Sequence, residues 1–320
     1  MILSVNTPNQ SLIKKMAEYL VTGGTSFIAS HVTKALLESG HSVRTTVRDS
    51  DEEKVGFLWE LKGAKERLKI FEADLTVEGS FDEAVNGVDG FFHIASRVSV
   101  ATVGLDNNNM VRLRNTVKRI VLTSSSTAIR YRFDATQVSP LNESHWTDLE
   151  YCKRFRIWYG YAKTLGEKEA WKMAVEKKLN LVVVIPTFCI GPIICPKPTS
   201  SPRIFLSIVK GARGSYPNFR GGFVHIDDVV AAQILAMEEP KASERILCSS
   251  SMAHWSEIIE MLRIKYPLYP FETKCGSEEG RDMPHSLDTT KIQQLGFTSF
   301  KSLPEMFDDC IKCFQDKGLL

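Results

Sequence analysis

Residues 19–30, YLVTGGTSFIAS, join an apolar run to a pair of glycines and then to a helical pattern. Gly23 and Gly24 let the chain bend sharply where the expected strand ends, because glycine adopts backbone angles that are closed to other residues. The first N–H groups of the following helix have no partner inside it and favour an anion such as a phosphate. Ser26 stands where such a turn usually has another glycine, so the turn alone favours a phosphate-bearing ligand only modestly.

Apolar runs and helical stretches alternate along the first two thirds of the chain. Six runs are expected to form strands, at residues 18–24, 42–49, 68–75, 90–96, 118–125 and 180–188. Nearly continuous apolar strands with helices between them indicate a parallel sheet that is covered on both faces. The sequence therefore predicts an α/β fold, a doubly wound parallel (Rossmann) sheet with right-handed crossovers.

The regular alternation ends after Gly191, where the segment GPIICPKPTSSP is a proline-rich loop. Beyond this loop we expect helices near residues 203–211, 225–239, 255–266 and 303–317, and one strand at 244–250. The predicted organisation is a disordered extension at 1–16, a dinucleotide-binding domain at 17–190 to which 225–250 returns, and a smaller C-terminal substrate lobe built from 191–224 and 251–320.

Composition and charge argue against several classes of function. The chain has 320 residues and a net charge of +2, with acids and bases interspersed, so no basic field indicates a nucleic-acid partner. The longest apolar run, at 181–195, is broken by two prolines and is too short to span a bilayer. Seven cysteines show no metal-binding spacing, and we interpret the CIKC motif at 310–313 as two core thiols. The odd count, without a secretory leader, predicts a reducing, cytoplasmic location.

The second expected strand ends in VRDSDEEK, at residues 47–54, which carries several charged side chains. At this end of a dinucleotide-binding sheet, an acid accepts from the 2′-hydroxyl of the adenosine ribose, or a base pairs with a 2′-phosphate. Both charges are present here, as Asp49 and Asp51 and as Arg48 and Lys54. The two basic residues favour NADPH over NADH, whereas a solvated charged turn is the alternative explanation.

The segment RIWYGYAKTLGEKEAW, at 156–171, places Tyr159 and Lys163 four residues apart on one face of an expected helix. A lysine ammonium beside a phenol favours the phenolate, which makes the tyrosine a usable proton donor near neutrality. Upstream, VLTSSS places Ser125 at the carboxyl end of the fifth expected strand, where the ligands of such sheets bind. Taken alone, the Tyr159–Lys163 spacing would be explained by chance, and Ser125 would be explained as a strand-end cap. The order of the glycine turn, Arg48, the strand-end serine and this pair along the chain nevertheless indicates one site.

These motifs resemble those of extended short-chain dehydrogenase/reductases of the plant dihydroflavonol reductase and cinnamoyl-CoA reductase group. Within the group the chain is particularly similar to the tetraketide α-pyrone reductases. The runs that carry the resemblance are EEKVGFLWE, ADLTVEGSFDEAVNGVDG, RYRFDATQVSPLNESHW, WYGYAKTLGE, GFVHIDDVVAAQILAMEEPKAS and SLPEMFDDC. They are highly specific, and the resemblance covers nearly all of residues 16–320. It implies an NADP-dependent oxidoreductase that acts on carbonyl groups.

The resemblance also implies roles for the residues at matching positions. Ser125 would bind the substrate carbonyl, Tyr159 would donate the proton, and Lys163 would assist Tyr159 and bind the nicotinamide ribose. Arg48 and Lys54 would bind the 2′-phosphate. The other expected cofactor contacts are Gly23, Thr25, Ser26, Phe27 and Ile28 at the pyrophosphate, Asp74 and Leu75 at the adenine, Ile94, Ala95 and Ser96 together with Pro186, Thr187, Phe188 and Cys189 beneath the cofactor, and Ser201 nearby.

The substrate expected from the resemblance is a small-molecule polyketide or phenylpropanoid. The first choice is the ketone of a tetraketide α-pyrone, in the synthesis of sporopollenin precursors, and the alternatives are hydroxycinnamoyl-CoA thioesters and dihydroflavonols. No metal is expected, because His225, Asp227 and Asp228 are better explained as the start of a helix. The oligomeric state stays open.

Three departures from the family pattern support a competing hypothesis, a catalytically silent relative with impaired cofactor binding. Ser26 replaces a family glycine, and its added Cβ and hydroxyl could displace the pyrophosphate. The segment 97–117 is shorter than its counterpart in the family, which would loosen the packing of the sheet. Residues 1–15 are additional.

Overall fold

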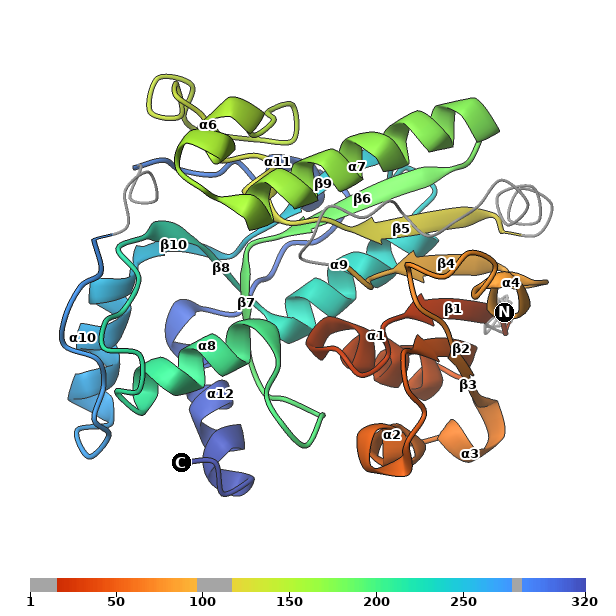
Figure 1. Ribbon diagram of the computed structural model, residues 1–320, viewed down its shortest axis with the longest axis horizontal. Helices are drawn as coiled ribbons and strands as arrows, with labels where there is room; N and C mark the ends of the chain where they lie inside the picture. The colour runs from red at the N-terminus through yellow and green to blue at the C-terminus, as the bar shows by residue number, and fades with distance from the viewer. Residues whose placement is uncertain (1–15, 97–116, 278–283) are drawn as a thin grey trace, which may run out of the picture.

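A computed structural model describes residues 16–96, 117–277 and 284–320, so the expectations for 1–15 and most of 97–117 lie outside the described residues. Its centre is a parallel seven-stranded sheet in the order β3-β2-β1-β4-β5-β6-β9 (Figure 1). The strands are β1 (Glu18–Thr22), β2 (Ser42–Val47), β3 (Leu68–Glu72), β4 (Gly90–His93), β5 (Arg119–Thr123), β6 (Leu181–Pro186) and β9 (Glu244–Cys248). The order reverses between β1 and β4, where a doubly wound sheet binds its ligand. The predicted Rossmann sheet is confirmed.

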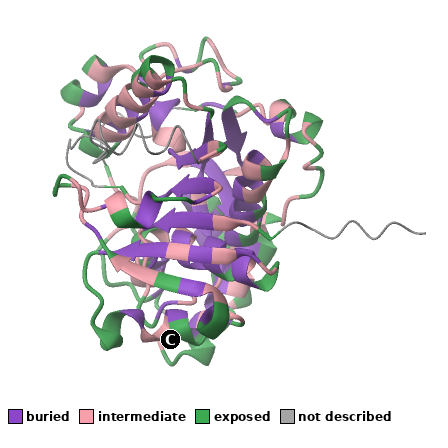
Figure 2. Cartoon of the chain, turned by 90° about the vertical axis from the view of Figure 1, so that its right-hand side faces the viewer, coloured by how far each residue is buried: buried purple, intermediate pink, exposed green. Residues whose placement is uncertain are grey.

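Helices cover both faces of this sheet, as Figure 1 shows. They are α1 (Phe27–Glu38) and α9 (Ile226–Glu238) on one face, and α4 (Asp82–Val85) and α7 (Trp158–Lys177) on the other. Successive strand residues enter opposite cores: Val21 of β1 packs with α1 and α9, and Leu20 packs with α4 and α7. Figure 2 shows the strands as the most deeply buried part of the chain.

A second, three-stranded sheet contains β7 (Phe188–Ile190), β8 (Arg220–His225) and β10 (Ser251–His254), and the sequence did not predict it. β8 pairs in parallel with β7 and antiparallel with β10. Because β7 begins two residues after β6 ends, this sheet lies beyond the carboxyl end of the large sheet (Figure 1). It therefore stands beside the edge at which the expected site residues are found.

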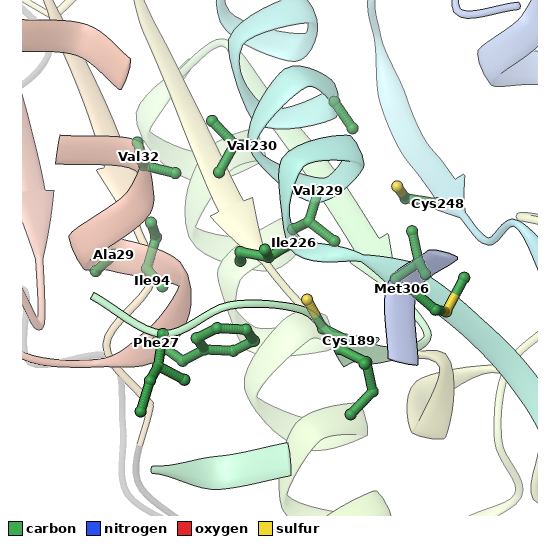
Figure 3. Close-up of a cluster of buried hydrophobic side chains, with 14 of the residues drawn as sticks. Phe27, Ala29, Val32, Ile94, Cys189, Ile226, Val229, Val230, Cys248 and Met306 are labelled. Atoms are coloured by element: carbon green, nitrogen blue, oxygen red, sulfur yellow. The ribbon is translucent and has the colours of Figure 1, made fainter. Parts of the chain in front are cut away.

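The other described elements are α2 (Glu52–Trp59), α3 (Ala64–Arg67), η1 (Ser126–Ala128), α6 (Leu149–Arg154), α8 (Ser200–Val209), α10 (Trp255–Lys265), α11 (Thr290–Gln294) and α12 (Leu303–Asp316). One buried cluster runs from α1 and α9 through β7 and β8 to α12, and Figure 3 shows part of it, from Phe27 to Met306. The division into a domain and a lobe stays a prediction. Within the described ranges, no helix is long and apolar enough to cross a membrane.

Candidate active site

The turn after β1 brings the backbone close to the neighbouring strand ends. Gly23 has a φ of 76°, and the N–H groups of Gly23 and Gly24 both donate to the carbonyl of Thr46, at 3.0 and 2.9 Å. A Cβ at Gly23 would lie 3.3 Å from Ala95, and a Cβ at Gly24 would overlap the side chain of Thr45. Only glycines allow this close approach, which directs the first N–H groups of α1 towards the carboxyl edge of the sheet.

Ser26 is the N-cap of α1 and has ordinary extended backbone angles, φ −84° and ψ 160°. A serine therefore fits the turn without backbone strain. Its hydroxyl does not cap the helix, and its Oγ is buried with no hydrogen-bond partner in the described part of the chain. An unpaired buried hydroxyl at a helix N-terminus fits a phosphate oxygen, to which it can donate. Impaired binding through Ser26 stays a prediction.

The other predicted residues of this turn, Thr25, Phe27 and Ile28, differ in how deeply their side chains are buried. Phe27 is buried in the core against α9 and the strand ends, as Figure 3 shows, so only its backbone can face a phosphate. Thr25 and Ile28 are half-buried. These residues together fit a bound pyrophosphate.

The two predicted cations after β2 differ in their partners within the described residues. Arg48 is exposed and forms no ion pair within the described residues. Lys54 instead contacts Asp49 and lies 3.3 Å from Asp51, and its hydrogen bond holds the pKa of Asp49 below its usual value. Arg48 is thus the better placed of the two predicted residues to pair with a 2′-phosphate.

The predicted adenine contacts follow β3. Asp74 accepts hydrogen bonds from the backbone N–H and the hydroxyl of Thr76, at 2.8 and 2.6 Å. Leu75 is half-buried against the core under α4. Asp74 is thus fixed by its own turn, beside the strand that carries Arg48.

Thr22, the last residue of β1, organises the segment after β4. Its Oγ1 accepts from the N–H groups of Ile94 and Ala95, at 3.1 and 3.0 Å, and lies 3.2 Å from Nδ1 of the buried His93. Ser96 is exposed. Sequence reasoning missed Thr22, although a threonine directly before a glycine turn is a visible signal of such a contact.

Lys163 and Ser125 both lie at the carboxyl end of β5. Lys163 Nζ donates to the carbonyl of Thr123 at 3.2 Å. Ser125 Oγ accepts from the N–H and the hydroxyl of Thr127, at 3.2 and 3.0 Å. Because these two bonds occupy the lone pairs of the Ser125 oxygen, its proton is left to donate to a substrate carbonyl.

Tyr159 is the second residue of α7, one turn before Lys163 on the same face. Its side chain is 43% exposed, and its hydroxyl forms no hydrogen bond with any described residue. The structure thus brings Lys163 and Ser125 to one strand end, and Tyr159 lies one helical turn before Lys163. No hydrogen bond joins these three side chains, and the role of Tyr159 stays a prediction.

A buried ion pair fixes α7 against the sheet. Glu167, one turn beyond Lys163, accepts from Nε of Arg245 at 2.7 Å and from the hydroxyl of Ser124. Arg245 also donates to the carbonyl of Glu143 at 2.7 Å. These bonds connect α7, β5 and β9 directly beneath Ser125. Sequence reasoning missed this network, because residue type alone does not show that a charge is buried.

The predicted residues after β6 lie at the same sheet edge. Pro186 ends β6, and Thr187 donates through its N–H to the carbonyl of Cys248 at 3.1 Å. Phe188 is half-buried. The Cys189 side chain lies in the core between Phe27 and Met306 (Figure 3), and the hydroxyl of Ser201 donates to its carbonyl. Burial raises the pKa of the Cys189 thiol, so only its backbone is suited to face a cofactor.

His225, Asp227 and Asp228 lie at the start of α9, as expected, but the residue that caps the helix is the histidine and not a carboxylate. His225 is the N-cap, and its Nδ1 accepts from the N–H of Asp227 at 3.0 Å. No group of three or more potential metal ligands occurs in the ranges that the structure describes.

The fold and the arrangement of this edge define an NAD(P)-dependent oxidoreductase of the short-chain dehydrogenase/reductase type. The pattern of the NAD dependent epimerase/dehydratase family matches residues 19–247, and the chain belongs to this family. It is 67% identical to tetraketide alpha-pyrone reductase 2 of Arabidopsis thaliana, over 95% of this chain and 100% of that protein. It is 36% identical to cinnamoyl-CoA reductase 2 of Medicago truncatula, over 94% and 92%.

Solved structures of reductases have the same fold. Vestitone reductase from alfalfa (Medicago sativa L.) superimposes with a TM-score of 0.79 and 34% identity, over 95% of this chain and 100% of that chain. The predicted resemblance to the tetraketide α-pyrone reductases and to the cinnamoyl-CoA reductases is thereby confirmed.

Proposed function

We propose that this protein is an NADPH-dependent carbonyl reductase that reduces the ketone of tetraketide α-pyrones in the synthesis of sporopollenin precursors. The observation that carries the proposal is the 67% identity to a tetraketide α-pyrone reductase along the full length of that protein. We further propose a cytoplasmic location, which is supported by seven cysteines that are all unpaired.

The residues at the sheet edge fit a bound dinucleotide. The N–H groups at the start of α1 and the Ser26 hydroxyl would bind the pyrophosphate. Arg48 would pair with the 2′-phosphate, which favours NADPH over NADH. When bound, this cofactor supplies a hydride to the carbonyl carbon.

The chain would supply hydrogen bonds and a proton to the carbonyl oxygen. Ser125 and Tyr159 would both donate to this oxygen as negative charge develops on it, where preorganised donors lower the barrier most. Tyr159 would then transfer its proton. Lys163, fixed by the carbonyl of Thr123, would stabilise the phenolate that results.

Replacing Tyr159 tests the proton donor. The variant Tyr159→Phe should lower kcat roughly 1,000-fold, since a positioned general acid contributes about 100- to 10,000-fold. Its NADPH dissociation constant, measured by fluorescence titration, should change little, because the pyrophosphate and 2′-phosphate contacts are intact. The matched control is Tyr161→Phe, two residues further along α7, where the ring packs on Trp158 at 6.2 Å between centroids. Full turnover by Tyr159→Phe would contradict the assignment.

A substrate panel tests the choice of ketone. With NADPH, kcat/KM should be highest for an α-pyrone bearing a ketone, and lower for hydroxycinnamoyl-CoA thioesters and dihydroflavonols. A higher value for either alternative would replace the pyrone as the substrate. If the native protein neither binds NADPH nor reduces any of the three classes, the catalytically silent relative is the correct hypothesis.

A further inference from the structure

Gln233 occupies an apolar position on the buried face of α9. Val229, Ala232 and Ala236 of this helix are fully buried, and Gln233 lies among them at the spacing of a single helix face. Gln233 itself is 0% exposed. An apolar side chain would be less costly to bury here, because a buried amide loses its hydrogen bonds to water. Packing alone therefore does not explain the glutamine.

The side-chain amide of Gln233 is only partly hydrogen-bonded. Its Nε2 donates to the hydroxyl oxygen of Thr123 at 2.7 Å, in a buried bond. Its Oε1 is buried with no hydrogen-bond partner among the described residues. A buried acceptor without a donor destabilises the folded state, so such a group requires a structural or functional reason. The bond to Thr123 is the contact that can supply this reason.

Thr123 is the last residue of β5, and its carbonyl lies past the end of the neighbouring strand. The N–H of Ser124 donates to the carbonyl of Val184 in β6, so the Thr123 carbonyl of the same planar peptide group points away from β6, towards β4. The pairing of β4 with β5 ends at Leu122. The Thr123 carbonyl is therefore open to a side chain, and Lys163 Nζ donates to it at 3.2 Å.

Two helices on opposite faces of the sheet thus meet at Thr123. Gln233 of α9 binds its hydroxyl from one face, and Lys163 of α7 binds its carbonyl from the other (Figure 1). A restrained Thr123 side chain fixes the peptide group that follows it. The position of the Lys163 ammonium therefore depends on a side chain that lies on the far side of the sheet.

We propose that Gln233 is a positioning residue for the reduction. It holds Thr123 in the orientation in which the Thr123 carbonyl anchors Lys163, and it thereby keeps the Lys163 ammonium near the phenol of Tyr159. Gln233 acts through Thr123 and Lys163 rather than on the reacting atoms. The unpaired Oε1 is the stability cost of this role. The inference rests on the proposed function, in which Tyr159 donates the proton and Lys163 assists it.

Gln233→Leu tests the role with a side chain of similar size. With NADPH and the ketone-bearing α-pyrone, kcat should fall about 10- to 100-fold, as expected for small displacements of catalytic groups. The alkaline limb of the kcat–pH profile should move to higher pH, because a phenol without a nearby ammonium loses its proton less readily. The urea midpoint should not fall, since the unpaired amide oxygen is removed as well. A lower midpoint with unchanged kcat and pH profile would overturn the inference and leave Gln233 a structural residue.

Variants of Thr123 test the same bond from its other end. Thr123→Val removes the hydroxyl but keeps the branched shape, and it should lower kcat as Gln233→Leu does. The double variant should be no slower than either single variant, because each breaks the same bond. Thr123→Ser is the matched conservative variant, and it should recover most of the turnover that Thr123→Val loses. Losses that multiply in the double variant would overturn the inference.

A labelling experiment separates this inference from the proposed function. The half-buried Lys163 is acetylated with limiting acetic anhydride, without cofactor or substrate, and its rate is compared by mass spectrometry with that of the exposed Lys172 on the same helix. Acetylation of Lys163 relative to Lys172 should be severalfold faster in Gln233→Leu and in Thr123→Val than in the native protein. Equal relative rates would overturn the role of Gln233 even where the native protein reduces the ketone. Faster labelling in both variants, with no reduction of any ketone by the native protein, would support the anchoring of Lys163 and reject the proposed function.

Discussion

At the scale of single residues, the candidate site contains polar groups that the described chain leaves unpaired. Among the described residues, Ser26 Oγ is buried without a hydrogen-bond partner, and Arg48 forms no ion pair. Ser125 accepts two hydrogen bonds from Thr127 and keeps its proton. These groups follow the parallel strands β1, β2 and β5, so they lie at the carboxyl edge of one sheet, with β4 between β1 and β5. Their chemistry complements the oxygens of a phosphorylated cofactor and of a carbonyl substrate.

Substitutions of Ser26 test whether its hydroxyl strengthens or weakens NADPH binding. If the hydroxyl donates to the pyrophosphate, Ser26→Ala and Ser26→Gly should each weaken NADPH binding about fivefold, as expected for one hydrogen bond of about 1 kcal/mol. The matched control is Ser39→Ala at the exposed C-terminal end of the same helix, which should have no effect. The measurement is fluorescence titration with NADPH. Tighter binding by Ser26→Gly would show instead that the serine obstructs the turn.

Arg48 gives a prediction about the choice of cofactor. Arg48→Gln should raise the KM for NADPH roughly 10- to 100-fold, because a charge-assisted bond contributes about 1.5–3 kcal/mol. The KM for NADH should change little, since NADH lacks the 2′-phosphate. Lys54→Gln is the matched comparison and should have a smaller effect, because Lys54 is already paired with Asp49 and Asp51. A larger effect from Lys54→Gln would reverse the assignment.

At the scale of elements, α7 carries two predicted site residues and one buried carboxylate along a single face. Tyr159, Lys163 and Glu167 are separated by four residues each, so they share a face of the helix. Lys163 reaches the backbone at the end of β5, and Glu167 is buried against Arg245 of β9. Lys163 and Glu167 therefore hold α7 against the sheet, and this position sets where Tyr159, the expected proton donor, lies.

This arrangement predicts strong coupling between Glu167 and Arg245. Glu167→Gln should lower the free energy of unfolding by about 3–5 kcal/mol, because it leaves the Arg245 charge buried and unpaired. The double variant with Arg245→Met should recover part of that loss. Urea unfolding of the two single variants and the double variant measures the coupling. Strictly additive losses would show that the pair does not act as a unit.

The sequence predicted the large sheet better than the small one. Apolar runs for β4, β5 and β6 are nearly continuous, and this pattern depends only on burial between two layers of helices. β8 contains Gly221 and Gly222, and two consecutive glycines in a sequence argue against a strand. In the structure they allow close packing, since a Cβ at Gly221 would overlap the Phe219 ring and a Cβ at Gly222 would lie 2.5 Å from Ser249 Oγ.

The candidate site was predictable to the extent that its residues follow strands. The glycine turn, Arg48 and Ser125 each lie at the carboxyl end of an expected strand, and the helical spacing joins Tyr159 to Lys163. Gln233 and the partners of Glu167 were not predictable in this way. Their importance comes from burial and from which polar groups are paired, and both depend on contacts between segments that lie far apart in sequence.

At the scale of the whole molecule, two neutral histidines are built into the core. His31 of α1 donates through Nδ1 to the carbonyl of Phe27 at 2.8 Å, and His93 of β4 lies against Thr22. The pKa of each imidazole is lowered to about 4, chiefly by burial and, for His93, also by the nearby Lys163 ammonium. Folding therefore keeps both rings uncharged at pH values where the unfolded chain would protonate them.

These histidines predict a loss of stability in mild acid. Their unfolded pKa is about 6.5, so below this value the unfolded state binds protons that the folded state does not, and stability falls until the folded pKa near 4 is reached. Each histidine should remove about 1.4 kcal/mol per pH unit inside this window, or roughly 2 kcal/mol between pH 7 and pH 5. Urea unfolding at pH 7, 6 and 5 measures this slope. In the double variant His31→Gln/His93→Gln the slope should become flatter even if the variant is less stable at pH 7. An unchanged slope would show that other groups control the response to acid.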